Sequence, residues 1–177
     1  MRRVFVQPDP KRVPDGTLLS EMLRVDGFSL AAGVIEPGLS SKIHLHPFVT
    51  QVTYVQSGRL MVWMRGPSDE KPYSLELISK QACLTEPGTF FQLVNPAYEP
   101  SHLLYIVSPP FLFETGPTGN VVYNDAVVLD GNWEDLARDK YDLGKLVKHF
   151  PTAQERQKSA ERLALMRKAT TRVLDRW

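Results

Sequence analysis

The chain has 177 residues, of which 42% are hydrophobic and 23% charged, with a formal net charge of +1. These values are typical of one soluble globular domain, and the balanced charge gives no indication of a nucleic-acid partner or a membrane partner. The single cysteine, Cys83, excludes an intramolecular disulfide and agrees with a reducing compartment. No apolar run is long enough for a signal peptide or a membrane span, so we expect a cytoplasmic protein.

Residues 1–27 are expected to form an N-terminal arm or edge strands, because Pro8, Pro10 and Pro14 remove backbone donors. Within this part, residues 18–25 fit either a strand or one or two helical turns, and the pattern does not decide between them. Further on, runs rich in β-branched and aromatic residues predict strands at 28–35, 42–46, 51–56, 60–65, 73–78, 82–84, 90–94 and 103–107. One further strand is predicted within residues 121–129.

Two of these strand predictions carry more detail. The turn Ser57-Gly58-Arg59 predicts a hairpin, in which residues 60–65 return antiparallel to residues 51–56. The run at 103–107 is continuously apolar, which indicates a strand buried on both faces. Many short strands separated by Gly and Pro turns favour an antiparallel sandwich or barrel.

The last part of the chain has a helical pattern. Residues 132–138 predict a short helix with Asn132 as its cap, and Thr152 to Glu155 fits a capping box that begins a longer helix. The longer helix has an apolar stripe at helical spacing, formed by Leu163, Met166, Thr170, Val173 and Trp177. Its basic residues are interpreted as a solvated face. We therefore expect a barrel over residues 28–130 and a helical extension over 131–177 of the same domain.

The stretch from Gly38 to Gly58 contains the most informative chemistry. His44 and His46 are one residue apart, so in a strand their side chains point to the same face. The spacing Gly38-x5-His44-x-His46-x4-Gln51-x6-Gly58 resembles the first motif of the cupin superfamily, with Gln51 where that family usually has Glu. A second cupin motif matches only at Gly88 and Asn95 and is degenerate.

The resemblance to cupins implies an all-β double-stranded β-helix, or jelly-roll barrel, with a pocket at its centre. It also implies one divalent metal ion, either Fe, Mn, Ni or Zn, on His44, His46 and Gln51. In the second motif Phe91 stands where cupins have a third histidine ligand. Three replacements stay open: a water or the substrate, His102 from a neighbouring strand, or Gln92 after a one-residue bulge.

Further residues are expected at the substrate pocket: Thr53, Phe91, Gln92 and Tyr105. Cys83 is interpreted as a small buried residue with a structural role. The expected function is that of a metal-dependent cupin enzyme acting on a small polar organic metabolite, with oxygenase chemistry slightly favoured over isomerase or lyase chemistry. The alternative is a non-catalytic cupin that binds a small molecule at a degenerate metal site. Apolar residues in the N-terminal arm and the last helix favour a homodimer.

Overall fold

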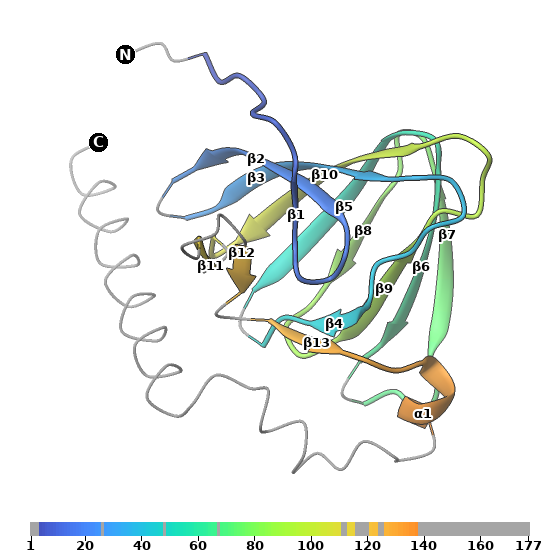
Figure 1. Ribbon diagram of the computed structural model, residues 1–177. Coiled ribbons are helices and arrows are strands. Elements are labelled where there is room, and N and C mark those ends of the chain that lie inside the picture. Colours follow the sequence, from blue (N-terminus) through green and yellow to red (C-terminus); the bar gives the residue numbers. More distant parts are fainter. Residues whose placement is uncertain are drawn as a thin grey trace, which may run out of the picture.

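A computed structural model describes residues 4–25, 27–47, 49–66, 68–110, 113–115, 121–123 and 126–137. Two antiparallel sheets dominate this part of the chain, one of six strands in the order β1-β2-β3-β10-β5-β8 and one of five in the order β13-β4-β9-β6-β7 (Figure 1). A separate pair is formed by β11 and β12. The six-stranded sheet comprises β1 (Lys11–Arg12), β2 (Leu18–Arg24), β3 (Ser29–Ile35), β10 (Ser101–Ser108), β5 (Thr50–Ser57) and β8 (Ala82–Thr85). The other strands are β13 (Val127–Leu129), β4 (Ile43–Leu45), β9 (Phe90–Val94), β6 (Arg59–Arg65), β7 (Tyr73–Ile78), β11 (Phe113–Thr115) and β12 (Val121–Tyr123).

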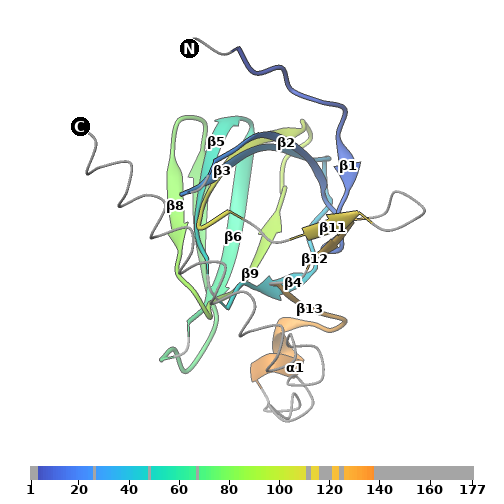
Figure 2. The ribbon, with the colours of Figure 1, turned by 90° about the vertical axis from the view of Figure 1, so that its left-hand side faces the viewer.

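The predicted jelly-roll architecture is confirmed for the described strands, since the two sheets face each other around a common interior (Figure 2). Each predicted strand from residue 28 to residue 107 is present within one or two residues of its expected bounds. The open alternative at residues 18–25 is decided in favour of a strand, β2. The single strand predicted within 121–129 is instead two strands, β12 and β13.

The prediction that residues 103–107 are buried on both faces is wrong. In β10 the side chains alternate, with Leu103, Tyr105 and Val107 buried and Ile106 42% exposed. An apolar run does not distinguish a strand buried on both faces from one whose outer face is also apolar. The outer face of the six-stranded sheet is therefore partly hydrophobic.

The hairpin predicted at Ser57-Gly58-Arg59 is also wrong. β5 pairs with β8 and β10, whereas β6 pairs with β7 and β9, so the turn carries the chain from one sheet to the other. Gly58 has φ +88° at this crossing, and a Cβ there would lie 2.8 Å from the carbonyl oxygen of Pro100. A glycine is required by both constraints.

Among the residues that the structure describes, the interior contains two apolar clusters. The larger cluster lies between the sheets and includes Val55, Leu60, Val62 and Leu103, each at 0% exposure. The smaller one joins β4 and β13 to Leu136 of the short helix α1 (Trp133–Ala137). The backbone amide of Leu136 donates to the carbonyl oxygen of Asn132 (3.2 Å), as expected where Asn132 precedes the helix.

The predicted helix over residues 152–177 lies outside the described residues, as does the helical extension beyond Ala137. Within the described part of the chain, no helix has the length and hydropathy of a membrane span. The proposed division at residues 27 and 130 stays a prediction, although β2, which precedes residue 28, belongs to the six-stranded sheet.

Candidate functional site: a polar cup at one end of the barrel

The two histidines lie on and beside the short strand β4. His44 pairs across the sheet with Phe91 on β9 and with Val128 on β13. His44 and His46 are 3% and 4% exposed, and their ring centroids are 5.4 Å apart. Both rings line one cavity, so the structure places them on the same side of the strand, as their spacing predicts.

A backbone hydrogen bond sets the chemical state of His44. Its Nδ1 lies 2.8 Å from the carbonyl oxygen of Lys42, so this nitrogen carries the proton and donates it. In the neutral ring the lone pair is then on Nε2, which lies 3.6 Å from Oδ2 of Asp15. His44 therefore presents either a base or, when protonated, one half of a buried ion pair.

Asp15 is a further residue of the cup that was not predicted from the sequence. It lies in the turn between β1 and β2, where its Oδ1 accepts hydrogen bonds from the backbone amide (2.9 Å) and the hydroxyl (2.7 Å) of Thr17. The backbone amide of Lys42 donates to the Asp15 carbonyl oxygen (2.7 Å), which fixes this turn, residues 13–17, to the barrel. The signal was available, because Asp15-Gly16 between two short strands is a strong hairpin pattern and Gly16 has φ +91°.

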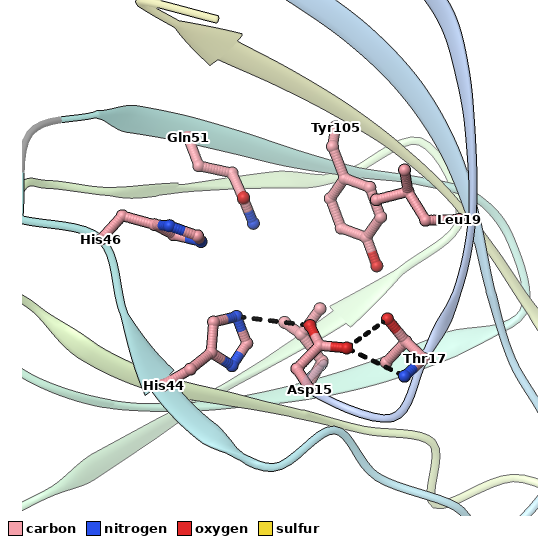
Figure 3. A pocket seen from close by; sticks show the side chains of 8 residues that line it. Asp15, Thr17, Leu19, His44, His46, Gln51 and Tyr105 are labelled. Atoms are coloured by element: carbon pink, nitrogen blue, oxygen red, sulfur yellow. Dashed lines mark hydrogen bonds and ion pairs between the residues drawn. The ribbon is translucent and has the colours of Figure 1, made fainter. Parts of the chain in front are cut away.

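Gln51 enters the cup from the opposite sheet. It is 4% exposed, and its Nε2 donates to the hydroxyl of buried Thr53 (3.0 Å) on the same strand. In Figure 3 the Gln51 amide points toward the space between His46 and Tyr105. Thr53 was predicted to line the pocket. Its hydroxyl accepts the hydrogen bond from Gln51 and so holds the Gln51 amide in place.

Tyr105 brings a second polar group to the cup, from β10. Its hydroxyl is buried, and among the described residues it has no hydrogen-bond partner. Burial, and then the charge of Asp15, raise the pKa of this phenol well above its ordinary value, so Tyr105 stays protonated. The ring packs over Gly33 so closely that a Cβ at residue 33 would lie 2.3 Å from Cε2 of Tyr105.

Polar side chains form most of the lining of the resulting cup (Figure 3). It encloses about 10 Å³ of space for the centre of a water-sized sphere, which is room for one water molecule. Its lining consists of Asp15, Thr17, Leu19, His44, His46, Gln51, Leu93 and Tyr105. An organic ligand larger than water therefore requires some of the groups that line the cup to move.

Three other predicted site residues lie elsewhere. Phe91 is fully buried and packs against the histidines, with centroid distances of 4.1 Å to His44 and 5.8 Å to His46. Gln92 faces away from the cup, where it donates to the Ser41 carbonyl oxygen and accepts from Trp133. No bulge in β9 turns Gln92 inward, and its neighbours Phe91 and Leu93 are the buried pair.

His102 is exposed, on the outer face of β10, so it does not reach the cup. Of the three replacements left open for the third histidine, the one by His102 is therefore wrong. The reason is the register, which pairs His102 with Val34 and Ser57 and directs Ser101 and Leu103 inward. A one-residue change of register inverts which side chains face the interior.

The side chains of the cup provide few ligands for a metal ion. The predicted donors are two imidazoles and one neutral amide, and Phe91 supplies no ligand atom. Within the described ranges no three side chains of His, Cys, Asp or Glu are arranged to hold an ion. The donor set therefore fits a resident divalent metal poorly, and metal binding stays a prediction.

Cys83 faces the apolar core from β8 and is 8% exposed. Burial raises the pKa of its thiol to about 11, because the charged thiolate is poorly solvated there. This agrees with the structural role expected of Cys83 and disfavours a reactive thiol.

Comparison with protein-family models and with curated proteins found no match. Comparison with solved structures found proteins with a similar fold. A structure of CapF with the inhibitor 3-isopropenyl-tropolone has a TM-score of 0.54 at 14% identity, over 73% of this chain and 35% of that chain. A structure of CapF from Staphylococcus aureus, a capsular polysaccharide assembling protein, has a TM-score of 0.51 at 13% identity. The match covers 69% of this chain and 34% of that chain. The Drosophila melanogaster CENP-C cupin domain has a TM-score of 0.48 at 18% identity, and the match covers 59% of this chain and 74% of that chain.

These likenesses are below 25% identity and therefore show the fold alone. The likeness to the two CapF structures supports the fold expected from the resemblance to cupins, and membership of that superfamily stays a prediction. The chain spans only about a third of the length of the CapF chains that it matches. Because a shared fold does not identify an activity, the activity and ligand of this protein have to be inferred from the chemistry of the cup.

Proposed function

We propose that this cupin-fold protein binds a small polar metabolite in the cup and catalyses proton transfer on it. The observation that carries the proposal is the pairing of His44 Nε2 with Asp15 Oδ2 at 3.6 Å, with His44 Nδ1 fixed by Lys42. A base whose second nitrogen is oriented by a backbone carbonyl is a common arrangement for general acid–base catalysis. Proton transfer of the isomerase or lyase type is favoured here over oxygenase chemistry.

The cup supports a specific division of roles. His44 would accept a proton from a carbon next to a carbonyl group, and Asp15 would stabilise the imidazolium that forms. The electron pair of the broken C–H bond forms a C=C bond to the carbonyl carbon, and the π pair of the C=O bond moves to the oxygen. There the Tyr105 hydroxyl donates a hydrogen bond to the developing negative charge. Because burial keeps Tyr105 protonated and no described residue accepts its hydrogen bond, its donor is available for this contact.

Deuterium exchange tests the proposal without knowledge of the complete reaction. The protein would be incubated in D₂O with a panel of small keto acids and keto sugars, and deuterium beside the carbonyl would be measured by NMR. We expect exchange with at least one compound, reduced about 10²–10⁴-fold in His44→Ala and in Asp15→Asn. His102→Ala, a histidine variant on the outer surface, should exchange at the wild-type rate.

Other outcomes would overturn the proposal. A compound that raises the melting temperature without exchanging deuterium would instead support the non-catalytic binding cupin. Near-stoichiometric bound metal that is lost in a His44→Ala/His46→Ala double variant would contradict a metal-independent site and support the predicted metal centre. Elemental analysis of both proteins therefore belongs beside the exchange experiment.

A further inference from the structure

The outer face of the six-stranded sheet has an apolar row that crosses five adjacent strands. Register places one residue from each strand side by side, running from β2 through β3, β10 and β5 to β8. We call this set the outer row: Leu23, Leu30, Ile106, Val52 and Leu84. With strands about 4.8 Å apart, the row is about 19 Å long.

The outer row is accessible in part. Ile106 is 42% exposed and Leu84 is 52% exposed, while the other three members are half-buried. A parallel set beside it is formed by Ala82, Tyr54 and Leu104, and it ends at Ala32 and Ser20, which are buried. A contiguous apolar surface of this kind is typical of a docking site rather than of a solvated sheet face.

The same chain contains a segment with a matching surface. Residues 152–177 predict a helix whose apolar stripe runs from Leu163 to Trp177, a distance of about 21 Å at 1.5 Å per residue. The stripe is therefore about as long as the outer row. Its five positions recur every three or four residues, which places them on one helical face and leaves the basic residues for water.

The connection is long enough for this contact. Residues 138–151 lie between α1 and the capping box and, when extended, reach about 46–50 Å. A globular domain of this size has a radius of gyration of about 14 Å, so the segment can reach any face of the barrel. Because it is covalently linked, its effective concentration at the sheet is in the millimolar range, which favours it over a separate partner.

We infer that residues 152–177 dock as an amphipathic helix on the outer row of the same chain. Apolar side chains of the stripe cover Ile106 and Leu84, and the arginines and lysines of the segment face solvent. The inference is independent of the chemistry of the cup, which lies on the inner face of the sheet.

Limited proteolysis of the full-length protein tests this contact, because trypsin cleaves after Arg and Lys and the segment contains many of them. We expect slow cleavage within residues 156–176 in the wild type and cleavage about tenfold faster in Ile106→Lys. The matched control is His102→Lys, which puts the same charge on the same strand and outer face but outside the row. Val173→Asp, which changes the stripe without adding or removing a trypsin site, should accelerate cleavage as Ile106→Lys does.

Three results would overturn the inference. One is rapid cleavage of the wild type, and another is an unchanged rate in Ile106→Lys. The third is protection that appears only at concentrations where sedimentation shows a dimer, since a second copy would then cover the row. Circular dichroism spectra and melting temperatures close to those of the wild type would show that the variants retain the barrel, as expected for the substitution of an exposed side chain.

Discussion

The cup and the apolar core are built on the same strands but differ completely in chemistry. Along β5 the inward residues are Gln51, Thr53 and Val55, so one strand passes from the polar cup to the apolar core in four residues. On β10 the buried hydroxyl of Tyr105 lies between Leu103 and Val107, which are both at 0% exposure. Burial is equally complete in both regions.

The difference between the two regions indicates where function lies. Apolar side chains in the interior stabilise the fold and need no hydrogen-bond partner. A buried hydroxyl without a hydrogen bond lowers the free energy of unfolding by about 1–3 kcal/mol. The cup retains such a group in Tyr105 and also keeps a carboxylate beside an imidazole. A polar ligand is the simplest reason to keep them.

The largest expected effect comes from Phe91, which separates the cup from the core. Phe91→Ala removes a fully buried ring in contact with both histidines, and we expect a loss of about 3–5 kcal/mol in the free energy of unfolding. Urea denaturation measures this loss. Leu39→Ala, at a side chain that is 55% exposed and lies outside the outer row, is the control and should cost far less. Equal effects at the two positions would remove the distinction between core and surface.

A smaller effect is expected at Gly33. Gly33→Ala places a Cβ 2.3 Å from the Tyr105 ring, so the ring must move, at a cost of about 1–3 kcal/mol. In a Tyr105→Ala background the same substitution should cost much less, because the ring that it meets is gone. A double-mutant cycle by thermal or urea denaturation measures the coupling. Additive effects would show that Gly33 does not position Tyr105.

The smallest and most specific effect concerns alkaline pH. The pKa of Tyr105 is raised in the folded protein, mainly by burial, so its contribution to stability is complete below the unfolded pKa of about 10 and is lost as pH rises further. Tyr105→Phe should therefore lose less stability than the wild type between pH 9 and 11. At pH 7 it should be close to neutral, because no described residue pairs with the hydroxyl.

Melting temperatures at several pH values measure both differences. Cys83 titrates in the same range, with its pKa raised to about 11, but it is present in both proteins and cancels in the comparison. Wild-type and Tyr105→Phe curves that remain parallel up to pH 11 would contradict the raised pKa. A large loss of stability in Tyr105→Phe at pH 7 would contradict the unpartnered hydroxyl.

Much of this protein followed from local sequence patterns. Alternation and turn residues predicted most of the strands, and the spacing of His44 and His46 predicted that they share a face. The jelly roll was implied by the resemblance of the stretch from Gly38 to Gly58 to the first cupin motif. These features depend on side chains a few residues apart, for which strand periodicity alone fixes the direction. The fold class could therefore be predicted from sequence.

Only the tertiary structure decided how distant segments meet. It brought Asp15 to His44, directed His102 and Gln92 away from the cup, and joined β5 to β6 across two sheets instead of in one hairpin. Each of these depends on strand register or on contacts between residues far apart in the chain, which local propensity does not encode. The sequence determined which residues face inward along most strands, and tertiary packing decided which of them share the cup.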